Sequence, residues 1–419
     1  MNSSEGPGQD TKRALDRVLV LPSWYPTIET PLHGSFVREQ ALMMEAGFDT
    51  KVLFARADTV SRSRALGNKV RRAMGRSAPS RDVTPMMKTP PDGIFFSHET
   101  GPSLSEQKTL QESVLHYGEQ IERLIQSGWR PDILHAHSVI YGGIIAHELS
   151  MRFDIPFIIT EHSPIIMNFY SQWLAQRLIL AFSSANAVMA VSHYLKRMIK
   201  THHIDCDPIV IGNAIDPNRF EISRPPKPSG PFRILYVTQP VWIKDLPTFF
   251  QALQHLKNDG HDDISVTVIV ADVEGGLKGG VAQAHAASAG VTEMVDFVEM
   301  VDREDMPGYY QQCDLLVSSS LSETFGLSLC EAMACGKPVV TTASGGVSDI
   351  VTPDNGIKVP IGDHQALAEG IAQIKTGSLV FDPENVRRSV LERFETRVFV
   401  EKLSSQYQEV LRNKKGESA

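Results

Sequence analysis

The chain has 419 residues, of which 42% are hydrophobic, and its 41 Lys and Arg against 49 Asp and Glu give a formal net charge of −8. This composition excludes a disordered chain, and the length predicts two domains at about 150 residues each. The acidic balance argues against nucleic acid as a partner. Four cysteines without a Cys-x-x-Cys pair exclude a disulfide scaffold. No apolar run approaches the ~20 residues that span a bilayer, so we expect a cytoplasmic protein.

Short β-branched runs alternate with helical stretches through the first half of the chain. Residues 1–16 are polar and carry Gly and Pro, which predicts a disordered tail. The runs predict strands at 17–21, 50–54, 133–135, 157–160, 187–191 and 209–211. Helices are expected between them at 37–46, 104–127, 142–153 and 171–184. Strands that alternate with helices indicate βαβ units and a buried parallel sheet, so residues 17–220 are predicted to form one α/β domain.

A proline-rich stretch at 221–231 interrupts the alternation and predicts a linker, because proline fixes φ and lacks an N–H donor. Strands are then expected at 233–237, 265–270, 295–298, 315–318 and 338–341. Helices are expected at 246–258, 306–313, 327–334 and 364–374. We therefore predict a second α/β domain over 232–390. A long helical pattern over 386–412 predicts that residues 391–419 form a crossover helix, with a tail, that returns to the first domain.

One segment departs from this plan. Between Arg56 and Lys88 there are nine basic and two acidic residues, and an apolar stripe runs at helical spacing through the part from Arg62 to Arg81. A basic amphipathic helix favours contact with anionic lipid, which would place the protein peripherally at the inner face of the membrane. The alternative is a solvated variable loop.

The strongest chemical signal lies between residues 322 and 340. Glu323 and Glu331 stand eight positions apart, on either side of Gly326, where a helix is expected to begin after a buried strand and a polar loop. The free N–H groups at a helix N-terminus and the positive end of its dipole suit a phosphate. Carboxylates beside such a site are suited to accept hydrogen bonds from sugar hydroxyls.

This stretch resembles the E-x7-E motif of retaining glycosyltransferases of family 4, which have the GT-B fold: two Rossmann-like doubly wound domains that face each other across a cleft. The resemblance implies that Glu323 contacts hydroxyls of the donor sugar and that Glu331 contacts the nucleotide ribose. It also implies that the backbone at Phe325, Gly326 and Leu327 binds the donor diphosphate.

Other positions match the same family one by one. Gly34 matches the glycine of the first βα loop, which faces the donor phosphates. His162, in Thr-Glu-His-Ser, matches the histidine that reaches the transferred sugar, and His137 ends the preceding strand. Each histidine could equally be a structural group at a strand end. Gly345 and Gly346 follow another strand, where glycine lets a ligand approach the backbone closely.

The start of the second domain departs from the family pattern. Lys244 stands at the spacing of the family's lysine, which neutralises the departing diphosphate, but Gln239 occupies the position of its arginine partner. A glutamine donates neutral hydrogen bonds, and charge-assisted bonds are roughly twice as strong. The departure leaves open a protein that binds the nucleotide-sugar but turns it over weakly.

We therefore predict a retaining glycosyltransferase with His162, Lys244 and Glu323 as its catalytic residues. It would move a sugar from a nucleotide-sugar donor to a glycan or lipid-linked acceptor, in biosynthesis of a cell-surface polysaccharide. No metal and no cofactor are expected. The alternatives are a catalytically weakened nucleotide-sugar-binding or partner subunit and a sugar-nucleotide epimerase. No Gly-x-Gly-x-x-Gly opens a helix, which argues against a dinucleotide-dependent dehydrogenase.

Overall fold

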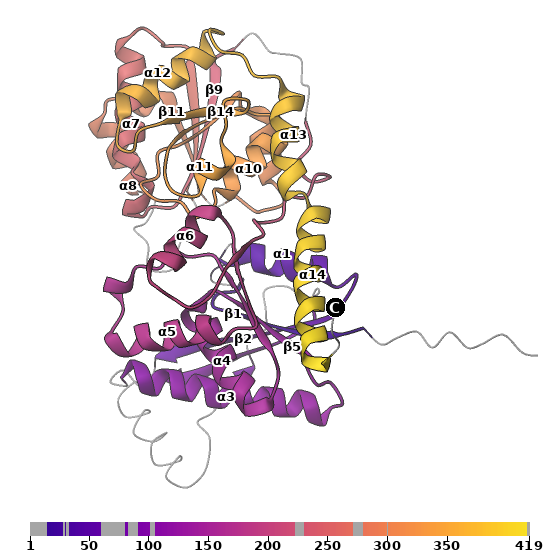
Figure 1. Cartoon of the computed structure of the whole chain (residues 1–419). Helices are drawn as coiled ribbons and strands as arrows, with labels where there is room; N and C mark the ends of the chain where they lie inside the picture. The colour runs from indigo at the N-terminus through magenta and orange to yellow at the C-terminus, as the bar shows by residue number, and fades with distance from the viewer. Residues whose placement is uncertain are drawn as a thin grey trace, which may run out of the picture.

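Two α/β domains make up the molecule, one above the other in Figure 1. The computed structural model describes residues 15–27, 30, 33–59, 80–82, 91–100, 105–222, 230–270, 280–299 and 301–416. The basic segment from Arg62 to Arg81 and most of the expected linker lie outside the described residues, apart from the backbone of 80–82. No helix in the described part of the chain is long and apolar enough to cross a membrane.

Within the described residues, an eight-stranded sheet forms the centre of the first domain, in the order β3-β4-β2-β1-β5-β6-β7-β8. Its strands are β1 (Arg17–Pro22), β2 (Asp49–Thr59), β3 (Ser80–Asp82), β4 (Gly93–Thr100), β5 (Ile133–His137), β6 (Phe157–Glu161), β7 (Ala187–Ala190) and β8 (Ile209–Val210). All neighbouring strands are parallel except β3 and β4. Every residue of β5 and β6 is buried, as expected for a parallel sheet covered on both faces.

Helices cover this first sheet on both faces (Figure 1). They are α1 (Ser35–Met44), α3 (Glu106–Gln126), η1 (Val139–Gly143), α4 (Ile144–Phe153), η2 (Met167–Phe169), α5 (Gln172–Ser184) and α6 (His193–Thr201). Helix α6 lies at the edge that faces the second domain, where the backbone N–H of Tyr194 donates a hydrogen bond to Asp349 at 3.1 Å. The two domains therefore touch through this helix.

The second domain has a six-stranded parallel sheet among its described residues, in the order β11-β10-β9-β12-β13-β14. Its strands are β9 (Phe232–Thr238), β10 (Ile264–Val270), β11 (Val295–Glu299), β12 (Leu315–Ser318), β13 (Val339–Thr342) and β14 (Gly356–Val359). Its helices are η3 (Trp242–Lys244), α7 (Leu246–Asn258), α8 (Gly280–Ser288), η4 (Thr292–Met294), α9 (Met306–Gln312), α10 (Leu327–Ala334), α11 (Val347–Ile350) and α12 (His364–Lys375).

Each sheet reverses its strand order beside its first strand. In the first domain β1 lies between β2 and β5, and in the second β9 lies between β10 and β12. Open α/β sheets bind ligands outside the carboxyl ends of the strands at this reversal. The loops that follow β1, β5, β9 and β12 are therefore where the fold places a site.

The C-terminal residues form two helices instead of the single stretch that the pattern over 386–412 predicts. Helix α13 (Pro383–Phe394) packs on α10, and α14 (Thr396–Lys415) packs on α1 of the first domain. Glu395 separates them in an extended conformation, because Ile215 hydrogen-bonds to the chain on both sides of it, at 2.8 and 3.0 Å. In Figure 1 the two helices run down one side of the molecule, from one domain to the other.

Candidate active site

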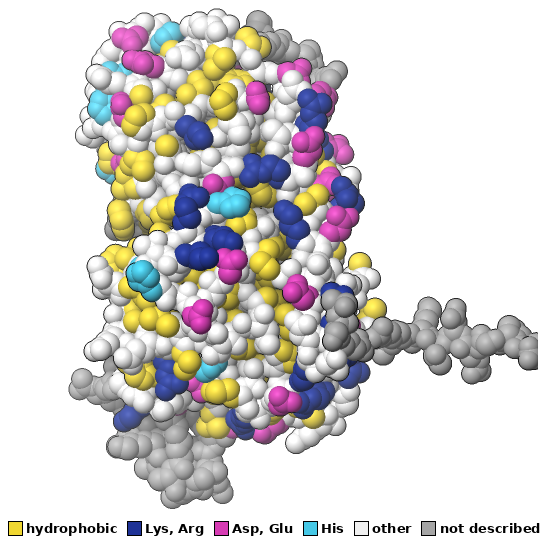
Figure 2. Space-filling view, in the orientation of Figure 1, with side chains coloured by type: hydrophobic (Ala, Val, Ile, Leu, Met, Phe, Trp, Pro, Cys, Tyr) yellow, Lys and Arg dark blue, Asp and Glu magenta, His cyan; other side chains and the backbone are white. Residues whose placement is uncertain are grey.

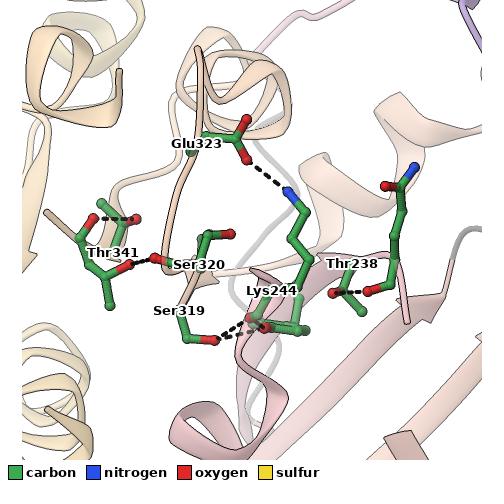
Figure 3. A network of polar contacts seen from close by, with 10 residues as sticks. Thr238, Lys244, Ser319, Ser320, Glu323 and Thr341 are labelled. Atoms are coloured by element: carbon green, nitrogen blue, oxygen red, sulfur yellow. Dashed lines mark hydrogen bonds and ion pairs between the residues drawn. The ribbon is translucent and has the colours of Figure 1, made fainter. Parts of the chain in front are cut away.

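An ion pair joins the two residues that the sequence places at the donor sugar and diphosphate. Lys244 Nζ lies 2.7 Å from Glu323 Oε2 (Figure 3). Lys244 ends η3, after strand β9, and Glu323 lies on the loop between β12 and α10. Both side chains remain about one-fifth exposed. Two residues 79 positions apart therefore meet at the carboxyl edge of the sheet, with part of each charge open to solvent.

The two loops that carry this pair are tied together by buried hydroxyl groups. Ser319 Oγ lies within hydrogen-bond distance of the carbonyl oxygens of Lys244 and Asp245, at 3.0 and 2.9 Å (Figure 3). Tyr236 Oη lies 3.0 Å from the Lys244 carbonyl and 2.8 Å from Ser319 Oγ. The N–H of Leu321 donates to the carbonyl of Ile243 at 2.8 Å. These bonds fix the backbone from which Lys244 reaches Glu323.

Helix α10 begins directly beside the ion pair. Gly326 precedes it with φ +97°, a left-handed conformation that favours glycine, and no side chain caps the N-terminus. The N–H groups of the first turn, which starts at Leu327, are thus the kind of donors that a phosphate accepts. The Phe325 side chain is buried and packs edge-on against Phe394, so it is not available to a ligand.

Gly345 and Gly346 pack against the same loop. A Cβ added to Gly345 would lie 2.5 Å from the Glu323 carbonyl oxygen, and one added to Gly346 would lie 2.0 Å from that of Thr324. The Gly346 N–H donates to the Glu323 carbonyl at 2.7 Å. The space beside these glycines is therefore filled by the chain's own backbone. The Gly345 position also touches the Tyr194 ring, which places this loop at the boundary between the domains.

Gln239 is the first residue after β9. Its carbonyl oxygen accepts hydrogen bonds from Thr238 Oγ1 at 3.2 Å and from the Val241 N–H at 2.8 Å. Three residues further on, the Trp242 side chain is 74% exposed. These two hydrogen bonds hold the Gln239 backbone in the turn that leads to Lys244.

Glu331 lies deeper than Glu323. It is only 2% exposed, and its Oε2 accepts a hydrogen bond from Tyr310 Oη at 2.7 Å. Its Oε1 lies 2.9 Å from Nη2 of Arg303, in the loop after β11. Sequence reasoning missed both partners. No local pattern marks them, because they stand 21 and 28 positions before Glu331 on other elements.

In the first domain, three histidines lie close together on β5 and just after β6. His137 Nδ1 lies 3.0 Å from His162 Nε2, and the rings stack with centroids 5.2 Å apart. His135 contacts Tyr407 Oη at 2.7 Å and Thr160 Oγ1 at 2.8 Å. Burial lowers the pKa of His137 to about 3 and also lowers the pKa of His162 well below its ordinary value. All three rings are therefore neutral at pH 7.

One ring nitrogen of His162 forms no hydrogen bond with the described residues. Its Nδ1 is buried and has no hydrogen-bond partner among the described residues. The buried Glu161 carboxylate holds the turn, accepting from the N–H groups of Val139, His162 and Ser163 at 2.8, 2.9 and 2.9 Å. An unpaired buried polar atom costs free energy, so a group that pairs with Nδ1 would be stabilised at this position.

Gly34 places α1 against the loop after β1. Its φ is +74°, and a Cβ at this position would lie 2.4 Å from the Trp24 carbonyl oxygen. Phe36, two residues later, packs against the His162 ring with centroids 4.8 Å apart. The glycine therefore serves a close approach of two backbone segments next to the histidines.

A cavity of about 280 Å³ opens beside these segments in the first domain. Its lining includes Ser23, Trp24, Tyr25, His33, Tyr117 and Tyr141. Ser23 is tied to the histidine strand, since its N–H donates to the His137 carbonyl at 3.1 Å. An aromatic wall with hydroxyl groups suits a sugar ring, because the ring faces are apolar and the rim is polar.

Two family models match the chain on either side of the domain boundary. The model of Glycosyltransferase Family 4 matches residues 94–219, and the model of Glycosyl transferases group 1 matches residues 218–388. The two Rossmann-like domains and the site at their sheet edges define the GT-B class. The chain belongs to the GT-B glycosyltransferases of the family 4 type.

Relatives found by sequence are glycosyltransferases, and solved structures share the fold. A D-inositol 3-phosphate glycosyltransferase of Arthrobacter sp. (strain FB24) is 27% identical over 294 residues, which cover 63% of this chain and 68% of that protein. Sucrose-phosphate synthase of Thermosynechococcus elongatus has a TM-score of 0.69 at 17% identity, covering 94% of this chain and 99% of that one. Anabaena HepE, solved with UDP-glucose, has a TM-score of 0.67 at 16% identity, covering 94% and 100%.

Proposed function

We propose that the enzyme is a retaining glycosyltransferase that moves a sugar from a nucleotide-sugar to a glycan or lipid-linked acceptor, in assembly of a cell-surface polysaccharide. One observation carries the proposal: the partly exposed Lys244–Glu323 pair at 2.7 Å, beside the uncapped N-terminus of α10. The cation and the free N–H groups suit a diphosphate, and the carboxylate beside them suits the hydroxyls of a sugar. The structures of HepE with UDP and with UDP-glucose support a nucleotide-sugar as the donor.

When the donor binds, the Lys244–Glu323 ion pair separates and each side chain contacts a different part of the donor. The Lys244 ammonium pairs with the diphosphate, which also accepts hydrogen bonds from the N–H groups of Gly326 and Leu327. Glu323 accepts hydrogen bonds from hydroxyls of the sugar. As the nucleoside diphosphate leaves, negative charge grows next to the ammonium and the helix N-terminus, where both stabilise it. No metal is required for this charge balance.

The first domain supplies the acceptor side. The free Nδ1 of neutral His162 binds a hydroxyl of the transferred sugar, and the aromatic cavity beside Trp24 holds the acceptor. The acceptor hydroxyl attacks from the face that the diphosphate leaves, and a phosphate oxygen takes its proton. Catalysis then consists mostly of positioning and charge stabilisation.

Basic side chains gather on the face shown in Figure 2, at the level where the two domains meet. A positive surface at this level would draw an anionic donor toward the boundary. The net charge of the chain is −8, so this gathering is local.

Donor turnover tests the proposal. The purified protein is incubated with UDP-, GDP- and ADP-sugars, and released nucleoside diphosphate is measured. We expect slow release from one donor, and a fall in kcat of about 100-fold in Glu323→Gln and Lys244→Ala, the scale of losing one charge-stabilising donor. Lys257→Ala is the matched control, since Lys257 pairs with Glu293 at the surface of the same domain.

A second function is favoured by Gln239. Where a cation is missing at the diphosphate, the protein could bind the nucleotide-sugar without turning it over, as a binding or partner subunit. Tight binding of a nucleoside diphosphate together with no release from any donor would establish this function and exclude the first.

A further inference from the structure

A buried carboxylate follows the N-terminus of α10 by about one helical turn. Glu331 lies four residues after Leu327, the first residue of the helix, so the two residues share a face. A rise of about 1.5 Å per residue separates them by ~6 Å along the helix axis. The proposed function places the donor diphosphate at this N-terminus. In a nucleoside diphosphate the ribose is joined directly to the diphosphate, so its hydroxyls come within reach of Glu331.

The two oxygens of this carboxylate have different surroundings. Oε2 accepts a hydrogen bond from Tyr310 Oη at 2.7 Å, and the fully buried Tyr310 ring packs edge-on against Phe220 with centroids 6.0 Å apart. Oε1 lies 2.9 Å from Nη2 of Arg303, a side chain that is about one-fifth exposed. No donor among the described residues is aligned with Oε1 for a hydrogen bond. Oε2 therefore lies on the interior side, whereas Oε1 can still accept a hydrogen bond from a ligand.

Tyr310 can act on Glu331 only as a hydrogen-bond donor. Burial and the negative charge of Glu331 raise the pKa of Tyr310 well above its ordinary value, so the phenol keeps its proton at pH 7. The last torsion of a glutamate side chain is soft, and a charge-assisted hydrogen bond to one oxygen restricts it. The bond to Oε2 thereby also fixes the position of Oε1.

We propose that Tyr310 is a positioning residue that makes the donor site selective for ribonucleotides. It holds Glu331 through Oε2, so that Oε1 accepts a hydrogen bond from a ribose hydroxyl, and Tyr310 itself does not touch the ligand. A nucleotide without ribose hydroxyls leaves Oε1 buried and unpaired, which costs binding free energy. The inference rests on the proposed function, since it takes a nucleotide-sugar as donor and places its diphosphate at α10.

Affinity for nucleotides with and without ribose hydroxyls tests the inference. UDP, GDP and ADP and their 2′,3′-dideoxy forms are titrated calorimetrically into the wild-type protein and into Tyr310→Phe, which removes only the phenol oxygen. We expect the wild-type protein to bind the accepted ribonucleotide at least about tenfold more tightly than its dideoxy form, the scale of a hydrogen bond to a charged group. In Tyr310→Phe this preference should fall below about threefold, because the carboxylate can turn, while the affinity for the dideoxy form stays the same.

Tyr407→Phe is the matched control. Tyr407 is also buried, and its phenol oxygen lies 2.7 Å from His135 Nδ1 in the first domain, so the variant loses a comparable hydrogen bond away from Glu331. It should keep the wild-type preference for ribose. Glu331→Asp leaves Tyr310 intact and so tests the inference even where Tyr310→Phe does not fold. Its shorter side chain keeps the charge but withdraws the carboxylate from the phenol, and the preference should fall here as well.

Equal loss of affinity for both nucleotide forms in Tyr310→Phe would indicate a structural role, which overturns the inference and leaves the proposed function intact. A full ribose preference in Tyr310→Phe or in Glu331→Asp, or its loss in Tyr407→Phe, would have the same consequence. So would a wild-type protein that binds both forms of a nucleotide equally well. Absence of binding of every nucleotide to the wild-type protein would overturn the proposed function, and the inference with it.

Discussion

In the proposed reaction, the side chain at position 239 decides how much positive charge faces the departing diphosphate. The structure holds the Gln239 backbone in the turn that carries Lys244, so a longer cationic side chain at 239 would start from the same place. Lys244 is itself paired with Glu323 at 2.7 Å in the free protein, which leaves the local charge balanced before a donor arrives. An added cation would therefore act mainly on the leaving group.

Gln239→Arg should raise kcat for donor turnover by about tenfold, which corresponds to ~1.4 kcal/mol off the barrier. The physical reason is a charge-assisted bond to the diphosphate in place of a neutral one. The measurement is nucleoside diphosphate release at saturating donor, with Gln239→Met as a control of similar length and no charge. A loss of activity in the arginine variant would show that the glutamine amide has a task of its own.

Loops at the carboxyl ends of the strands, more than the strands themselves, form the walls of the cavity in the first domain. The loop after β1, the N-terminus of α1 and η1 after β5 meet there, held by Gly34, whose φ of +74° lets the Trp24 carbonyl come close. Tyr141 of η1 is 44% exposed at this cavity. Its ring is available to a ligand at little cost to the fold, since exposed substitutions usually change stability by less than about 0.5 kcal/mol.

Tyr141→Ala should raise the KM for the acceptor by roughly tenfold, the loss of one ring contact worth about 1–1.5 kcal/mol, while the melting temperature stays unchanged. Tyr141→Phe retains the ring and should retain the KM. The assay is transfer to an acceptor at fixed saturating donor. An unchanged KM in the alanine variant would place the acceptor outside this cavity.

The molecule as a whole is joined by elements that cross between its domains. Helix α14 leaves the second domain and buries Phe399, Leu403 and Tyr407 against the first sheet. Tyr407 reaches His135 at 2.7 Å, so the last helix of the chain contacts the histidine cluster. His135 therefore depends on packing against a residue 272 positions further along the chain.

Acid should destabilise the whole molecule through these histidines. In the folded state burial lowers the pKa of His137 to about 3, whereas the unfolded value is 6.5, so between these values the unfolded state binds more protons. The free energy of unfolding therefore rises with pH across this window and is lost as pH falls, by at most ~1.4 kcal/mol per pH unit for each such group. The pKa values of His135 and His162 shift in the same direction, whereas Glu161, whose pKa burial raises, opposes them.

The melting temperature should accordingly drop between pH 7.5 and pH 5. His137→Gln removes one titrating group and should make the drop smaller, even where the variant is less stable at pH 7.5. Differential scanning calorimetry at the two pH values measures both. A drop of the same size in His137→Gln would contradict this origin of the acid sensitivity.

The sequence by itself determined the fold class and the alternation of strands with helices, because hydrophobic periodicity and turn residues are local, but it did not predict β4, β14, α6 or α8. It also determined that Glu323, Gly326 and Leu327 share one loop and helix start, and the ranges 133–135 and 157–160 anticipated β5 and β6. These features rest on neighbours within a few residues. The break at Glu395 escaped the pattern because its cause, the pairing with Ile215, lies 180 positions away.

Only the tertiary structure decided which charges meet. Arg303 and Glu39 are 264 positions apart in the chain, yet they form one of the links between the domains. The same holds for Glu331: the family resemblance implies a ribose ligand there, but its burial and its partners follow from the packing of α9 and the loop after β11 against α10. Side-chain pairing between distant elements depends on how the sheets and helices dock, and no local pattern encodes that.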